Sequence, residues 1–273
     1  MAGAPLADLS EARARAVAGG VSLAPTAAYS LDGAGQPQLA PTSDPDLRLA
    51  TFGDLATAEA IAVLVPGVSH TAAEFDRPDG SPDPTGSLVS LPDAARMLQA
   101  VAAADGAAVV TVAWLGYEPP GSVATALRAG PLEQGAANLA AFQEFLRSVR
   151  PEARITWVCH SYGSLVCAAA REARPDAIVL LGSPGVELDG AAAFTDLGVE
   201  LFAAGGDDDP IGFTQAMRPL GIGFGPDPAD IDFGAQIIAC SPGTRHSDYL
   251  LPGTASLEGV AAAVLGRPQP AHV

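Results

Sequence analysis

From residue 61 onward, the sequence alternates short, continuous apolar runs with longer segments of helical periodicity. A continuous apolar run of this kind is typical of a strand that is covered on both faces of its sheet. The runs are IAVLV (61–65), AVVTVAWL (108–115), ITWVC (155–159), AIVLL (177–181), VELFAA (199–204) and QIIAC (236–240). Because strands that alternate with helices form a doubly wound, mostly parallel sheet, we predict an α/β fold.

Three helices are expected between or after these runs. Residues 92–104 carry apolar side chains on one face and stop at an Asp-Gly pair. Residues 131–149 repeat apolar side chains at helical spacing, and Pro131 suits the first position of a helix. The last helix is expected over 256–265, ending at Gly266.

The first 46 residues are predicted to form an extension packed on the core. Residues 8–18 have the pattern of a short helix, and the segments TAAYSL and QPQLAP flank the Gly-rich turn DGAG, which indicates a β-hairpin. A further strand is expected at 47–52. The predicted organisation is therefore an extension over 1–46, a main domain over 47–266 and a tail over 267–273.

The charge and apolar patterning of the sequence disfavour nucleic acid, anionic lipid and a membrane span. The net charge is −17, from 31 acidic and 14 basic residues, and a field of that sign repels nucleic acid and anionic lipid. No stretch approaches the roughly 18 apolar residues of a membrane span, so none is expected. The N-terminus lacks a basic head followed by an apolar run, which predicts a cytoplasmic protein.

All basic residues are arginines, and the sequence contains no lysine. A P-loop, a protein kinase, a pyridoxal enzyme and a Ser-Lys hydrolase each need a lysine, so these classes are disfavoured. The cysteines Cys159, Cys167 and Cys240 are odd in number and form no CxxC pair. We therefore expect them to be reduced and mostly buried, with no metal site and no cofactor.

The segment ITWVCHSYGSLVCAAAREA (155–173) contains the clearest candidate for a catalytic motif. An apolar strand leads into Cys159-His160-Ser161-Tyr162-Gly163 and then into an Ala-rich helix. This is the pattern of a nucleophile elbow, G-x-S-x-G, with Cys159 in place of the first glycine. Such a turn pushes the serine outward, and the following helix directs its free N–H groups at a developing oxyanion. Ser161 is the predicted nucleophile.

The base and the acid are expected to follow Ser161 along the chain. His246 comes after the last apolar run and before the last helix, which is where the base lies when the chain order is Ser, acid, His. The segment DDDPI follows an apolar run and a Gly-Gly turn, and one of its aspartates could orient the imidazole. Of Asp207, Asp208 and Asp209 we choose Asp209, with Asp208 as the next choice.

The turn after the first core strand, VLVPGVSH, is expected to complete the site. The backbone N–H groups of Val68 and Tyr162 are the predicted oxyanion donors. His70, Trp114 and Tyr117 lie after core strands, near the sheet edge where ligands bind in open α/β sheets, and are candidates for lining a substrate pocket. Ordinary packing at a strand end is an equal alternative for the two aromatic residues.

Taken together, these segments resemble a bacterial α/β-hydrolase family of unknown substrate that has a predicted Ser-His-Asp triad. The matching segments are TFGDLATAEAIAVLVPGVSHTAAEFD, VAWLGYEPP, VCHSYGSLV, VLLGSPGV, DDDPI and RHSDYL. The resemblance implies the α/β-hydrolase fold and a triad of Ser161, an aspartate of DDDPI and His246. Cys159 departs from the usual glycine, and the family implies no particular substrate.

The leading hypothesis is hydrolysis of an ester or related acyl compound through an acyl-enzyme. A thioesterase or acyltransferase would use the same residues. A binding module that kept the fold and lost catalysis is a different class, disfavoured by the intact triad candidates. A metallohydrolase has no supporting HExxH motif. The expected partner is a small acyl substrate, and the oligomeric state is left open.

Overall fold

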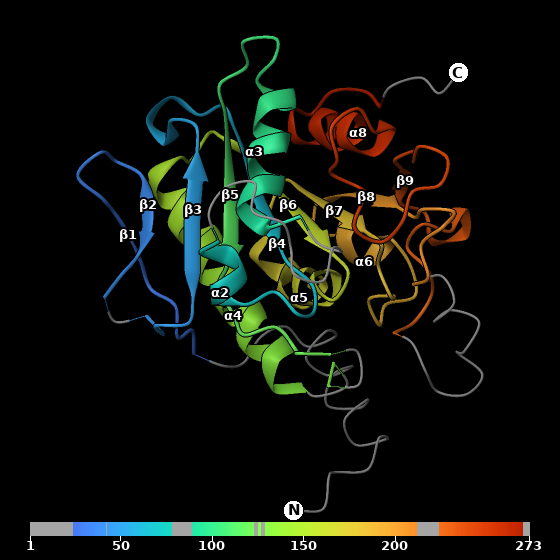
Figure 1. Cartoon of the computed structure of the whole chain (residues 1–273), viewed down its shortest axis with the longest axis horizontal. Helices are drawn as coiled ribbons and strands as arrows, with labels where there is room; N and C mark the ends of the chain where they lie inside the picture. Colours follow the sequence, from blue (N-terminus) through green and yellow to red (C-terminus); the bar gives the residue numbers. More distant parts are fainter. Residues whose placement is uncertain are drawn as a thin grey trace, which may run out of the picture.

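A seven-stranded twisted sheet organises the part of the chain that the structure describes (Figure 1). The computed structural model describes residues 24–41, 43–77, 89–122, 125–126, 129–211 and 224–269. Within these ranges seven strands pair in the order β3-β5-β4-β6-β7-β8-β9. The strands are β3 (Arg48–Phe52), β4 (Ala60–Val65), β5 (Val109–Leu115), β6 (Arg154–His160), β7 (Ala177–Leu181), β8 (Glu200–Ala204) and β9 (Gln236–Ile237).

The sheet is mostly parallel, as the alternating pattern predicts. Only β3, at one edge, runs antiparallel to its neighbour β5, and every other described pair in this sheet is parallel. The last apolar run forms a shorter strand than expected, because only Gln236 and Ile237 pair with β8. The N–H of Ile238 still donates to the carbonyl of Ala203, after which the chain leaves the sheet edge.

Helices cover both faces of the sheet (Figure 1). The helix α3 (Leu91–Ala102) packs beside α8 (Ala255–Val264) on one face, and α4 (Ala129–Val149) packs beside α5 (Gly163–Ala170) on the other. The three helices expected from the sequence are therefore present, with ends within a few residues of the prediction. The short elements are α2 (Ala72–Phe75), α6 (Ala192–Thr195), η1 (Leu55–Thr57), η2 (Arg171–Ala173) and η4 (Ile231–Phe233).

The central strand β4 shows why the apolar runs are continuous. All six of its residues are buried. Ile61, Val63 and Val65 belong to the core on the α4/α5 face. Alternate residues Ala60, Ala62 and Leu64 belong to the core on the α3/α8 face. Since successive side chains of a strand point to opposite faces, a strand between two helical layers needs apolar residues at every position.

The expected N-terminal hairpin is present as β1 (Tyr29–Leu31) paired antiparallel with β2 (Pro37–Leu39). It is tied to α4 by Asn138, whose buried side chain accepts hydrogen bonds from the N–H groups of Thr26 (2.8 Å) and Ala27 (3.0 Å). The same amide donates to the carbonyl of Gly116 at 2.6 Å. The helix predicted over 8–18 lies outside the described residues.

In the described part of the chain, each helix is too short or too polar to pass through a bilayer.

We predict that Asn138→Ala lowers the free energy of unfolding by roughly 2–4 kcal/mol, because the buried N–H of Ala27, the partly buried N–H of Thr26 and the carbonyl of Gly116 lose their partner. Chemical denaturation followed by circular dichroism measures the change. Ser148→Ala, at an exposed position of the same helix, serves as the control and should stay within about 0.5 kcal/mol of wild type. Equal stability of the two variants would mean that the hairpin segment is not held by Asn138.

Candidate active site

Ser161 follows β6 in a backbone conformation that L-residues rarely adopt. Its φ is 53°, its N–H donates to the carbonyl of Leu181 at 2.9 Å, and α5 begins two residues later at Gly163. A non-glycine residue at positive φ costs roughly 1–3 kcal/mol and is often found at functional sites. The strand, strained turn and helix are the structural context that the nucleophile-elbow interpretation requires.

Two glycines let neighbouring backbone approach this turn. A Cβ on Gly163 would lie 2.5 Å from the carbonyl oxygen of Val65 and 2.7 Å from that of Pro66. A Cβ on Gly67 would lie 2.7 Å from Cβ and 3.2 Å from Oγ of Ser161. The turn after β4 therefore packs directly against the turn after β6, and neither position has room for a larger residue.

Cys159 and Cys167 form a disulfide, so the expectation that the cysteines are reduced is wrong for this pair. Their Cα atoms are 6.5 Å apart, within the range that the bond spans. The bond joins the end of β6 to α5 across the turn that holds Ser161. An odd number of cysteines excludes pairing of all three but does not exclude one pair, and Cys240 remains the free thiol.

The ring of His246 lies against the carboxylate of Asp209. Nδ1 of His246 is 2.9 Å from each carboxylate oxygen. The Asp209 side chain is 2% exposed, and that of His246 is 25% exposed. A buried carboxylate that accepts the Nδ1–H leaves Nε2 as the nitrogen able to accept a proton, which is the arrangement of a catalytic base and its orienting acid.

Hydrogen bonds keep the Asp209 carboxylate ionised. Burial by itself would raise the pKa of Asp209, but the hydrogen bonds from His246 and Tyr249, the charge on His246 and the N–H of Ile211 together hold the pKa below its ordinary value. The tyrosine hydroxyl donates to Oδ2 at 2.6 Å, and the Ile211 N–H donates to Oδ1 at 2.8 Å.

The two preceding aspartates take different places. Oδ1 of Asp207 accepts the N–H groups of Gly243 (2.9 Å) and Thr244 (3.1 Å), which ties the turn after β8 to the loop that carries His246. The Asp208 side chain is exposed. Of the three candidates, Asp209 is the one hydrogen-bonded to His246.

Ser161 and the His246–Asp209 pair both lie near the end of β7, where Gly182 follows Leu181. The N–H of Ser161 bonds to the residue before this glycine, and a Cβ on Gly182 would lie 2.7 Å from Oδ2 of Asp209 and 3.0 Å from Nδ1 of His246. Among the described residues, no hydrogen bond joins Oγ of Ser161 to the His246 ring. Such bonds are often long before substrate binds, so the geometry does not remove His246 as the base.

His160, next to Ser161, supports the loop that carries His246. Its Nε2–H donates to the backbone carbonyl of His246 at 2.7 Å, and the two rings are 4.6 Å apart. Burial, together with the nearby charge of His246, lowers the pKa of His160 to about 3. The His160 ring therefore stays neutral at ordinary pH and donates from Nε2, because a carbonyl oxygen only accepts.

The predicted oxyanion donors lie on the two turns that pack together. Tyr162 is buried at the start of α5, and Val68 is half-buried, next to Gly67. The next residue, Ser69, has a φ of 67°, and its N–H donates to the carbonyl of Pro120 at 3.0 Å. This hydrogen bond ties the turn that contains Val68 to the segment after β5.

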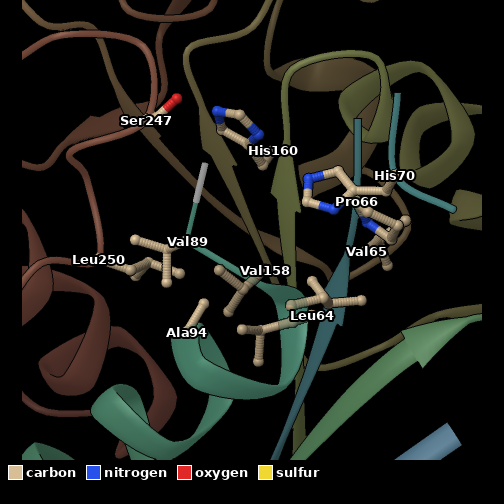
Figure 2. A pocket seen from close by; sticks show the side chains of 11 residues that line it. Leu64, Val65, Pro66, His70, Val89, Ala94, Val158, His160, Ser247 and Leu250 are labelled. Carbon is tan, nitrogen blue, oxygen red and sulfur yellow. The ribbon is translucent and has the colours of Figure 1, made fainter. Parts of the chain in front are cut away.

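Two cavities flank this turn, and His70 lines both. A small, mostly apolar cavity of about 60 Å³ lies between β4, β6 and α3, with His160 and Ser247 also in its wall (Figure 2). Figure 2 shows the rings of His70 and His160 facing Val158, Ala94 and Leu64 across it. A larger one of about 350 Å³ is lined by Tyr117.

Trp114 lines neither cavity. It is fully buried, stacks behind Tyr117 with ring centroids 6.1 Å apart, and donates from Nε1 to the Tyr29 hydroxyl at 2.9 Å. Its place matches the alternative of ordinary packing. Tyr117 is also buried, and its hydroxyl donates to the carbonyl of Pro66 at 2.6 Å, which supports the turn after β4.

Within the described ranges, no three His, Cys, Asp or Glu side chains come together in a way that could hold a metal ion.

A family model described as alpha/beta hydrolase matches residues 44–219, which is more than half of the chain. The chain belongs to the alpha/beta hydrolase family. The resemblance and the fold class expected from the sequence are thereby confirmed.

Among curated proteins, an uncharacterised protein of Mycobacterium bovis and one of Mycobacterium tuberculosis are each 31% identical to this chain over 168 residues. The alignments cover 58% of this chain and 59% of each relative, so the chain matches less than two thirds of these relatives' length.

Solved structures with a similar fold include an α/β serine hydrolase without a lid from Xanthomonas campestris, 18% identical with a TM-score of 0.46. That similarity covers 93% of this chain and 99% of the other. A cold-adapted esterase from an Arctic intertidal metagenomic library is 13% identical with a TM-score of 0.48, covering 88% and 92%.

We predict that His160 makes stability fall in acid. Its folded pKa of about 3 lies below the ordinary 6.5, so the unfolded chain binds a proton that the folded protein does not. The resulting stabilisation is complete above pH 6.5 and is lost as the pH falls from there toward 3, at up to about 1.4 kcal/mol per pH unit. Urea unfolding of wild type and His160→Gln across this range should give a shallower slope for the variant. If the unfolding free energies of the two proteins change equally with pH, His160 is not the source of the acid sensitivity.

Proposed function

We propose that this protein is a serine hydrolase that cleaves an ester or related acyl compound through an acyl-enzyme. The observation that carries the proposal is the hydrogen-bonded pair His246–Asp209, which lies next to Gly182, the residue after the one that binds the N–H of Ser161. The positive φ of Ser161, between β6 and α5, supports its assignment as the nucleophile. Membership of the alpha/beta hydrolase family supports a hydrolytic reaction.

In this mechanism Oγ of Ser161 attacks the carbonyl carbon while Nε2 of His246 takes the hydroxyl proton. Asp209 holds the Nδ1–H and stabilises the imidazolium. The backbone N–H groups of Val68 and Tyr162 donate to the negative oxygen of the tetrahedral intermediate. The imidazolium then gives its proton to the leaving alcohol, and water, activated by the same base, releases the acid from the acyl-serine.

The size and place of the small cavity favour a substrate with a short acyl group. Its wall includes His160 and Ser247, which adjoin the predicted nucleophile and base, and its volume of about 60 Å³ has room for on the order of four water molecules. We infer that the acyl chain enters this cavity and that the larger one, lined by His70 and Tyr117, takes the rest of the substrate. A thioesterase or acyltransferase remains the alternative use of the same residues.

The net charge and the disulfide bear on the partner and the location. A net charge of −17 supports a small-molecule substrate over nucleic acid. The cytoplasmic location stays a prediction from the N-terminal sequence. The disulfide between Cys159 and Cys167 weighs against it, because such bonds persist mainly in oxidising compartments.

A fluorophosphonate probe tests the triad. We expect it to label wild type and not Ser161→Ala, and we expect His246→Ala to lose about a thousand-fold or more in kcat on a p-nitrophenyl ester. Asp209→Asn should lose up to about 10⁴ in kcat, because the imidazole can take the wrong tautomer. Asp208→Asn is the matched control and should remain within a few-fold of wild type. Asp207→Asn should do the same, because its amide oxygen can still accept the N–H groups of Gly243 and Thr244. Labelling that survives Ser161→Ala would remove the proposed nucleophile.

Ala94→Val tests the acyl cavity. The added methyl groups would fill part of its wall, so kcat/KM for p-nitrophenyl butyrate should fall about tenfold more than that for the acetate. Ala100→Val makes the same change at an exposed position of α3 and should leave the ratio of the two substrates unchanged. If Ala94→Val lowers both substrates equally, the acyl chain binds elsewhere.

A further inference from the structure

Tyr249, three residues after His246, hydrogen-bonds to the proposed triad acid. Its hydroxyl donates to Oδ2 of Asp209 at 2.6 Å, the oxygen that also lies 2.9 Å from Nδ1 of His246. One carboxylate oxygen is therefore shared between the tyrosine and the histidine.

The direction of the tyrosine proton is fixed by a second contact. The N–H of Gly206 donates to the Tyr249 hydroxyl oxygen at 2.9 Å. Because that N–H points at the hydroxyl oxygen, the hydroxyl proton is directed to Asp209. Gly206 and Asp209 both belong to the turn after β8, so the hydroxyl connects the two ends of one turn.

The tyrosine is itself held in place on several sides. Its side chain is buried, and a Cβ on Gly182 would lie 3.0 Å from its Cε2. Its backbone carbonyl accepts the hydroxyl of buried Ser256, at the start of α8, at 2.7 Å. Burial, the hydrogen bond to Asp209 and the charge of that carboxylate all raise the pKa of Tyr249, so the group remains a donor.

We propose that Tyr249 is a positioning residue that sets the orientation and charge of the Asp209 carboxylate, and through it the basicity of His246. The proposal rests on the proposed function for its catalytic meaning, although the coupling between the three groups exists whether or not the protein turns over an ester.

Removing the Tyr249 hydroxyl should change the pKa of His246 in a predictable direction. A donor to Oδ2 draws negative charge away from the imidazole, so its loss leaves more charge to stabilise the imidazolium. The pKa of His246 should therefore rise in Tyr249→Phe. At neutral pH a larger fraction of the His246 rings is then protonated, and the Asp209 carboxylate has lost one of the donors that orient it, so kcat should fall.

Of three other titratable groups near the pair, His160 and Cys240 keep one protonation state over roughly pH 5 to 9, whereas Asp227 needs its own control. His160 packs on the His246 ring with a pKa of about 3, so it stays neutral. Burial, together with the charges of Asp207 and Asp209, raises the pKa of Cys240 to about 11, so its thiol keeps its proton. Asp227 faces Asp209 from the loop before η4, and burial raises its pKa, so its titration must be separated from that of His246.

The experiment is an NMR titration of the histidine ring signals, assigned with His246→Gln, in wild type, Tyr249→Phe and Asp227→Asn. We expect Tyr249→Phe to raise the pKa of His246 by roughly 0.5–1 unit. We also expect it to lower kcat at pH 7 about tenfold, with KM within about twofold of wild type. Asp227→Asn should leave the Tyr249→Phe shift in place when the two are combined.

Tyr29→Phe is the matched control. The Tyr29 hydroxyl also accepts one hydrogen bond, from Trp114 (2.9 Å), and donates one, to the carbonyl of Asn138 (3.3 Å), but it lies in the N-terminal hairpin. This variant should lose stability without moving the pKa of His246. If Tyr249→Phe does not fold, 3-fluorotyrosine at position 249 replaces it, and its stronger donor should lower the pKa of His246.

A His246 pKa in Tyr249→Phe that is within about 0.2 unit of wild type, or lower, overturns the proposal. In the protein with 3-fluorotyrosine at position 249, an unchanged or raised pKa of His246 also overturns the proposal. Because the titration needs no substrate, it separates a failure of the proposed function from a failure of the Tyr249 proposal. If Ser161 is not labelled by fluorophosphonate but the pKa moves as expected, the proposed function fails while the coupling stands.

Discussion

The contact between the turns that follow β4 and β6 is the constraint on which the site depends. Gly67 lies against Ser161, and Gly163 lies against the carbonyl groups of Val65 and Pro66. The parallel pairing of β4 with β6 brings both turns to the same sheet edge, and the two glycines allow them to touch. As a result, the strained serine and the turn that carries Val68 form one packed unit.

The second half of the site depends on burying a carboxylate without leaving it unpaired. An isolated buried charge is strongly unfavourable, and Asp209 avoids this by accepting hydrogen bonds from a ring nitrogen, a hydroxyl and a backbone N–H. Each donor comes from a segment at the carboxyl edge of the sheet. The fold therefore orients the carboxylate from several directions, and a change in any one donor alters the charge that faces His246.

Much of this could be predicted from the sequence because the signals are local. Continuous apolar runs locate the buried strands, and the order of strand, Cys-His-Ser-Tyr-Gly and helix locates Ser161. Long-range contacts gave no such signal. Tyr249 looks like an ordinary core residue until Gly206 and Asp209 are placed beside it. The choice among three adjacent aspartates depends on the curvature of one turn, and the position of Trp114 depends on the hairpin that covers it. The sequence does not indicate the disulfide, because an odd number of cysteines is compatible both with three thiols and with one pair.

The disulfide also determines how the protein reacts with reagents that modify thiols. With Cys159 and Cys167 joined, the only thiol is that of Cys240, which is half-buried and whose pKa is raised to about 11. Since the thiolate is the reactive form, the oxidised, folded protein presents almost no nucleophilic sulfur at neutral pH. An electrophile aimed at nucleophiles in general would therefore meet the hydroxyl of the elbow serine with little competition from cysteine chemistry.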